Sequence, residues 1–103
     1  MSEKTTLERK VAGKAVVFRR QLTLANGGRE LSRLLAADRD GSNSWDINIA
    51  IMQIVVESWG LEGDPSQATS YEGLDLFEHL APLWAATQEY IADRIGKQQQ
   101  TKN

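Results

Sequence analysis

Residues 45–59 read WDINIAIMQIVVESW and contain few polar side chains. On a helix with 3.6 residues per turn, the apolar side chains form two adjacent stripes that cover most of the circumference. One stripe holds Ile47, Ile51, Ile54 and Val55, and the other holds Trp45, Ile49, Met52, Val56 and Trp59. A surface helix has a single apolar face, so this pattern predicts a central helix over residues 44–59 that the rest of the fold encloses.

A buried β-strand is the alternative for this segment, because three isoleucines also alternate along it and β-branched residues are frequent. About fifteen residues is long for a strand and ordinary for a helix, so the length favours a helix. Asn43 is placed to cap that helix, with Asp46 three residues later, and Gly60 is placed to end it. A membrane span needs roughly 20 apolar residues, and the run is shorter and contains Asp46 and Glu57.

The N-terminal part of the chain predicts a β-hairpin. Two short runs with strand-forming residues, 5–11 and 15–19, flank a turn that contains Gly13. An amphipathic helix over residues 7–18, interrupted at Gly13, is the alternative. Farther along, leucines recur at helical spacing in residues 29–37 and predict a short amphipathic helix.

The C-terminal third predicts an interrupted helix. Thr69 and Glu72 have the spacing of a capping box, which predicts that a helix starts there. Pro82 lacks the N–H that would bond back to Glu78, so the helix should kink or restart, with Pro82 in the first turn of the new segment. An apolar stripe then continues to Gly96, which is the predicted end.

Length and composition are those of one ordinary globular domain, with 103 residues, 41% hydrophobic and 25% charged. The predicted fold is mainly α (α+β): an N-terminal β-hairpin followed by a three- to four-helix bundle around the central helix. We expect one domain over residues 1–96 and a disordered polar tail at residues 97–103. The first ten residues lack the apolar core of a signal peptide, so we expect a cytoplasmic location.

Residues suited to catalysis or metal binding are few, and the sequence contains no cysteine. The one histidine, His79, sits in a predicted helix, where packed or surface histidines are commoner than catalytic ones. Asp38 and Asp40 suggest a calcium loop, but Asn43 and Ile49 stand where such a loop needs glycine and glutamate. A solvated loop explains the remaining acids near the central helix: Glu57, Glu62 and Asp64. We therefore expect no enzymatic activity, no cofactor and no metal.

Charge is distributed unevenly along the chain. Residues 1–20 have a net charge of +4, whereas residues 21–95 have a net charge of −8. Phe18, Arg19 and Arg20 close the basic hairpin, and basic strands with an aromatic residue can follow a phosphate backbone. A small nucleic-acid-binding module that uses this hairpin is thus the alternative function. The acidic remainder and the sequence pI near 5.3 oppose it.

The second half of the chain contains short motifs in a recognisable order. They are Glu57-Ser58-Trp59, Glu62-Gly63-Asp64-Pro65, Leu74-Asp75-Leu76 and Pro82-Leu83, after an N-terminal hairpin and Leu22-Thr23-Leu24. This order resembles the small tail assembly chaperones of long-tailed bacteriophages. The resemblance implies a protein that binds the tape measure protein and keeps it soluble during tail assembly, in the cytoplasm of an infected bacterium and not in the mature virion. Further candidate partners are the tail tube protein, a frameshifted longer form of the chain and a second copy of the chain.

Three aromatic residues are the candidate partner-binding residues: Phe77, Trp84 and Tyr90. They are spaced by seven and six residues, and one helix face in so small a core cannot bury all three beside its leucines and isoleucines. Large aromatic side chains are favoured anchors at protein interfaces. We predict that aromatic surface stays exposed, first at Trp84 and Tyr90 and then at Phe77, with burial of Trp84 as the alternative.

Overall fold

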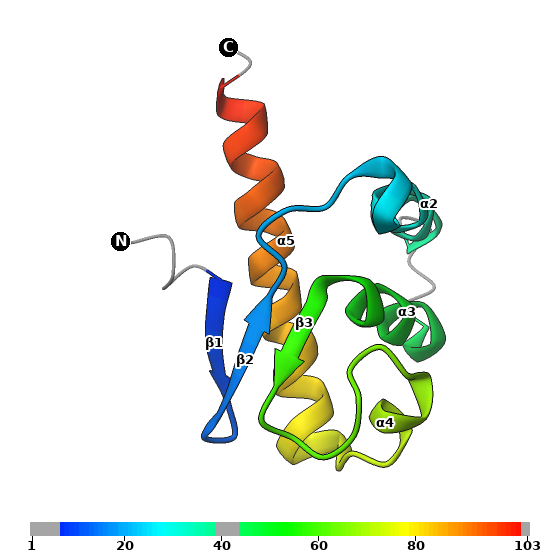
Figure 1. The fold of residues 1–103 in the computed structure, drawn as a ribbon, viewed down its shortest axis with the longest axis vertical. Coiled ribbons are helices and arrows are strands. Elements are labelled where there is room, and N and C mark those ends of the chain that lie inside the picture. The colour runs from blue at the N-terminus through cyan, green and yellow to red at the C-terminus, as the bar shows by residue number, and fades with distance from the viewer. Residues whose placement is uncertain (1–6, 39–43, 102–103) are drawn as a thin grey trace.

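The computed structural model describes residues 7–38 and 44–101, with side chains described at 7–37 and 44–94. About 60% of the chain is helical, and three short strands form an antiparallel sheet (Figure 1). The predicted class, mainly α with an N-terminal hairpin, is therefore confirmed. The elements in order are β1 (Glu8–Val11), β2 (Lys14–Phe18), η1 (Leu24–Gly28), α2 (Arg29–Asp38), α3 (Trp45–Val55), β3 (Val56–Trp59), α4 (Ala68–Glu72), η2 (Leu76–Leu80) and α5 (Ala81–Thr101).

The hairpin forms where the sequence predicts it. Strands β1 and β2 pair antiparallel, with Val11 opposite Lys14, so only Ala12 and Gly13 make the turn. Both turn residues have positive φ angles, 52° and 79°, as the commonest two-residue hairpin turn requires. Glycine adopts this conformation at little cost, which explains its place in the turn.

The central helix is shorter than predicted. It ends at Val55, and the next four residues, β3, leave the helix and pair antiparallel with β2. The prediction of a helix over residues 44–59 is thus wrong for its last four residues. Gly60 ends a strand instead of a helix, and its N–H donates to the carbonyl oxygen of Ala15 at 2.9 Å. The physical reason is the open edge of β2, which supplies hydrogen-bond partners to a segment whose Val56 and Trp59 are residue types suited to a strand.

The start of α3 is capped by Ser44. Its side-chain oxygen accepts a hydrogen bond from the backbone N–H of Asp46 at 3.1 Å. The predicted cap, Asn43, lies outside the described residues. Ile51 and Val55 are fully buried, so the structure confirms that the helix is enclosed by the rest of the fold.

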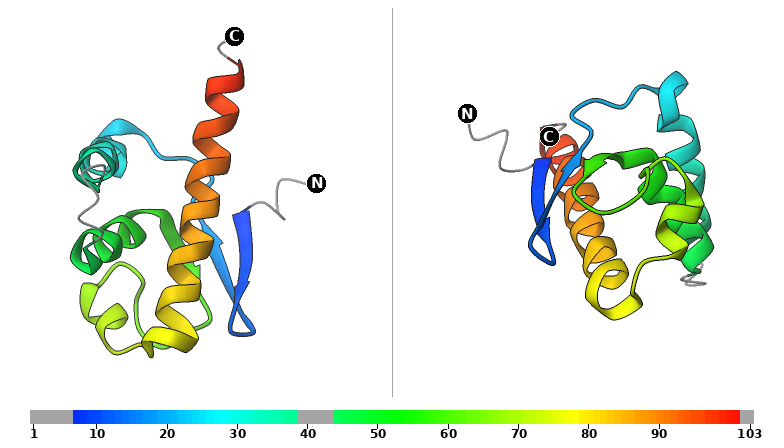
Figure 2. Two further views of the ribbon diagram at one scale, coloured as in Figure 1. Left: turned by 180° about the vertical axis from the view of Figure 1, so that it is seen from behind. Right: turned by 60° about the horizontal axis from the view of Figure 1, so that its bottom comes forward.

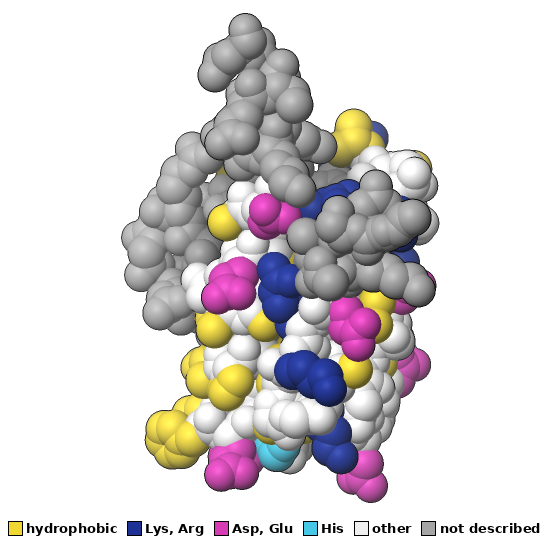
Figure 3. All heavy atoms as spheres, turned by 90° about the vertical axis from the view of Figure 1, so that its left-hand side faces the viewer, with side chains coloured by type: hydrophobic (Ala, Val, Ile, Leu, Met, Phe, Trp, Pro, Cys, Tyr) yellow, Lys and Arg dark blue, Asp and Glu magenta, His cyan; other side chains and the backbone are white. Residues whose placement is uncertain are grey.

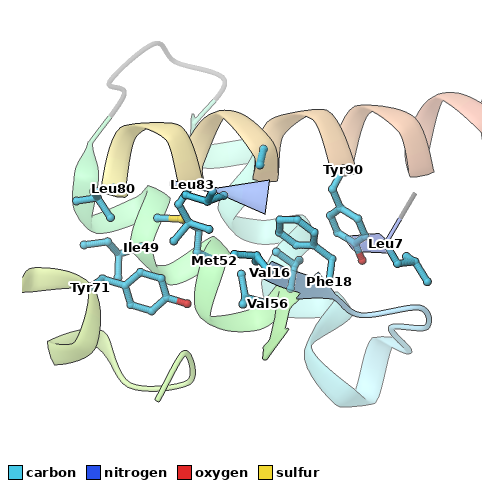
Figure 4. Packing of buried hydrophobic residues seen from close by; sticks show 13 residues of the cluster. Leu7, Val16, Phe18, Ile49, Met52, Val56, Tyr71, Leu80, Leu83 and Tyr90 are labelled. Atoms are coloured by element: carbon cyan, nitrogen blue, oxygen red, sulfur yellow. The ribbon is translucent and has the colours of Figure 1, made fainter. Parts of the chain in front are cut away.

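The hydrophobic core lies between α5 on one side and the sheet with α3 on the other (Figure 4). Seen from behind, α5 crosses the back of the sheet, while α2, α3 and α4 lie together beside it (Figure 2). The residues of α5 that face the core recur at intervals of three or four, as a helix with one buried face requires. They are Leu83, Ala86, Thr87 and Tyr90.

The C-terminal helical region is interrupted earlier than predicted. Helix α4 is a single short segment that begins at Ala68, one residue before the predicted start at Thr69, and ends at Glu72, with Gly73 as its C-cap. A new helical segment starts after Asp75, with η2 leading directly into α5. Pro82 lies in the first turn of α5, as predicted.

Helix α5 continues to Thr101, beyond the predicted end at Gly96. A glycine inside a helix lowers its stability by roughly 1 kcal/mol relative to alanine, which a long helix can absorb. The division of the chain into a domain of residues 1–96 and a disordered tail stays a prediction.

Candidate functional site

The three candidate aromatic residues lie in different environments. Phe77 is 82% exposed, Trp84 is half-buried against the core, and Tyr90 is only 5% exposed. Leu76, which the sequence did not single out, is 41% exposed beside Phe77. We call Leu76, Phe77 and Trp84 the Phe77 surface. Hydrophobic side chains gather at the lower left of Figure 3, over η2 and the start of α5.

Asp75 positions the Phe77 surface. Its carboxylate oxygen Oδ2 accepts hydrogen bonds from the backbone N–H groups of Phe77 at 3.1 Å and Glu78 at 2.8 Å. The backbone N–H of Leu80 bonds back to the carbonyl oxygen of Asp75 at 2.9 Å, which closes a wide π-type turn. This turn ends with Leu80 buried and Phe77 directed to solvent.

Asp75→Ala is expected to lower the free energy of unfolding by about 1 kcal/mol, because the first N–H groups of the helical segment lose their acceptor. Asp75→Asn is the matched control, since asparagine is an equally good capping residue. Chemical denaturation of the three proteins measures the difference. Equal stability of Asp75→Ala and the parent would show that this cap does not hold η2 in place.

Tyr90 is a core residue, contrary to its predicted exposure. Its ring stacks on Phe18 with a centroid separation of 4.7 Å and an interplanar angle of 14°. Its hydroxyl donates a hydrogen bond to the carbonyl oxygen of Arg19 at 2.7 Å, and burial raises the pKa of this hydroxyl. Ala86 and Thr87 lie on the same buried face of α5 as Tyr90. Tyr90 is therefore almost fully enclosed and offers a partner little aromatic surface.

The loop after β3 brings two of the recognised motifs together. The indole N–H of Trp59 donates to the carbonyl oxygen of Gly63 at 2.9 Å. The ring centroids of Trp59 and Tyr71 are 4.8 Å apart. The Tyr71 hydroxyl in turn donates to the carbonyl oxygen of Pro65 at 2.6 Å. Hydrogen bonds from the backbone N–H and then the hydroxyl of Ser66 lower the pKa of the Asp64 carboxyl. These contacts hold the loop in shape, which is a structural role.

Two arginines of the basic hairpin bond to other parts of the chain. The Arg19 side-chain Nε–H donates to the carbonyl oxygen of Ile54 at 2.7 Å, and Arg9 pairs with Glu89 at 3.6 Å. Lys10 and Lys14 are exposed. These contacts occupy some of the N–H donors that the two arginines could otherwise offer to phosphate groups.

The described residues contain no group of three His, Cys, Asp or Glu side chains that could hold a metal ion. His79 is half-buried in η2, and Asp40 of the rejected calcium loop lies outside the described residues. Within the same part of the chain, no helix is both long enough and apolar enough to cross a bilayer. Comparison with models of known protein families, with curated proteins and with solved structures found no match.

Proposed function

We propose that this chain is a non-enzymatic binding protein that holds an apolar segment of a protein partner against the Phe77 surface. The observation that carries the proposal is the 82% exposure of Phe77 on a turn that Asp75 caps. The binding free energy becomes more favourable when a partner removes an exposed phenylalanine side chain from water. Aromatic residues are enriched at such interfaces. In this proposal α2, α4 and α5 form a bundle around α3 that holds η2 in place.

Acidic residues flank the Phe77 surface along the chain and limit the partners that suit it. Asp75 directly precedes Leu76, Glu78 directly follows Phe77, and both are exposed. Complementary charge steers association and disfavours partners of like charge. A segment with Lys or Arg beside its apolar side chains therefore fits best.

The tape measure protein is the proposed partner because the chain resembles tail assembly chaperones. Under the proposal, the chain binds the tape measure protein and keeps it soluble while the tail is built in the infected bacterium. The tail tube protein and a frameshifted longer form of the chain are further partners on the same proposal. The exposed apolar side chains of the Phe77 surface support this proposal.

Phe77→Ser is expected to reduce the amount of tape measure protein that stays soluble on co-expression by ten-fold or more, which corresponds to the loss of about 1.4 kcal/mol or more of binding free energy at an interface hot spot. Phe77→Leu, which keeps an apolar side chain, is the matched control and should retain most of the capture. Because Phe77 is exposed, both variants should melt within a few degrees of the parent. Undiminished capture by Phe77→Ser would refute this site.

A further inference from the structure

A second apolar surface lies between α2 and α5. It is a groove of about 250 Å³, open to solvent, and three separate segments of the chain line it. Its apolar lining comes mainly from half-buried aliphatic side chains: Leu22, Leu31, Leu35 and Ile91. Leu24 stands at the edge and is 61% exposed. No residue of the Phe77 surface takes part in this groove.

The charge at the groove is positive, which distinguishes it from the Phe77 surface. Arg20 and Arg94 both line it, and none of its described lining residues is acidic. The Nη2 group of Arg94 donates a hydrogen bond to the carbonyl oxygen of Arg20, which holds the Arg94 guanidinium beside the groove. A guanidinium has five N–H donors, so this one bond leaves Arg94 able to form a paired hydrogen bond with an incoming carboxylate.

We propose that this groove is a docking site for an acidic amphipathic segment of a partner protein. The segment places one aromatic or two aliphatic side chains on the leucines and sets a carboxylate against Arg94. Charge complementarity identifies the occupant: the lining is apolar with arginines beside it, so an acidic segment is attracted and a basic one repelled.

The size of the groove favours a peptide over a small molecule. Pockets for whole ligands enclose roughly 300–1,000 Å³ and cover most of the ligand. This groove is smaller and open, so it can receive a few side chains of a chain that continues beyond it. An amphipathic helix presents such side chains three or four residues apart on one face.

The site is independent of the proposed function. Ile91 lies seven residues after Trp84, the nearest residue of the Phe77 surface, and fourteen residues after Phe77, so the two surfaces are about 10–20 Å apart along the helical axis. They also carry opposite charge. One partner could occupy either surface alone, and each has its own exposed side chain that tests it.

The experiment is a selection of displayed random 16-residue peptides on the immobilised full chain. Enriched peptides are expected to have net negative charge and two large apolar residues three or four positions apart. The Kd of a selected peptide should rise about ten-fold or more in Leu24→Glu, which removes apolar surface and adds a repelling charge. It should rise about two- to five-fold in Arg94→Gln, which removes one exposed charge pair.

Phe77→Glu is the matched control, because it makes the same kind of change at an exposed residue outside the groove, and it should leave the Kd unchanged. Thermal melts establish that Leu24→Glu stays folded, as its exposure predicts. Failure to enrich acidic peptides, or loss of binding in Phe77→Glu but not in Leu24→Glu, would overturn the proposal. So would self-association that Leu24→Glu abolishes, because a second copy would then occupy the groove. Capture of the tape measure protein depends on Phe77 and is measured separately, so either proposal can fail alone.

Discussion

Ile51→Asp is expected to abolish the cooperative unfolding transition of this protein. Ile51 has no exposed surface and sits in the middle of α3, where a carboxylate would find no partner among branched apolar side chains. An unpaired buried charge costs about 4 kcal/mol or more, which is a large share of the roughly 5–15 kcal/mol that stabilises a typical domain. Circular dichroism during heating measures the transition.

Ile51→Val is the control for this prediction. It removes one methylene group and should cost about 0.5–1.5 kcal/mol while the transition stays cooperative. The pair separates the effect of charge from the effect of altered packing. An aspartate variant that melts like the parent would mean that α3 is not enclosed, and the described core would be wrong.

Tyr90→Ala should lower the free energy of unfolding by about 3–5 kcal/mol, because it removes a ring that packs on Phe18 and leaves a cavity between α5 and the sheet. Tyr90→Phe keeps the ring and loses only the hydroxyl bond to the carbonyl oxygen of Arg19, so it should cost about 1 kcal/mol. Urea denaturation measures both values. If both variants lost the same small amount of unfolding free energy, the stacked arrangement would be contradicted and Tyr90 would be an exposed residue.

The hairpin and the buried part of α3 were predictable because local signals specify them. Gly13 lies between two runs of strand-forming residues, and the structure places it in the turn. The two apolar stripes of α3 predict enclosure, and Ile51, Met52 and Val55 are fully buried. These features depend on periodicity and turn chemistry, which a single sequence displays.

Strand β3 was not predictable in the same way. The apolar pattern continues through Val56 and Trp59 at helical spacing, so nothing local ends the helix at Val55. The strand forms because β2 lies alongside, with Val16 opposite Trp59 and Phe18 opposite Val56. Pairing between segments some forty residues apart is a tertiary effect that overrides local preference.

The exposure of the three candidate aromatic residues was predicted in part, whereas their role in binding a partner stays a prediction. Spacing correctly indicated that aromatic surface is left over, and Phe77 carries it, but spacing alone put Tyr90 there as well. Tyr90 is buried through its contacts with Phe18 and Arg19, and the spacing of residues along one helix does not display such tertiary contacts. The helical segment that starts after Asp75 leaves Phe77 exposed.

The contact of Tyr90 with Phe18 and Arg19 has a consequence for synthesis of the chain. The hydroxyl bond joins residues 71 positions apart, so Tyr90 is synthesised well after the hairpin that it packs on. Contacts between such distant segments form late in folding because the intervening chain must first be ordered. On the ribosome, Phe18 therefore lacks its stacking contact with Tyr90 until that part of α5 has left the exit tunnel. A nascent chain that stops before residue 90 keeps the pairing of β2 with β3 but leaves the ring of Phe18 without its aromatic neighbour.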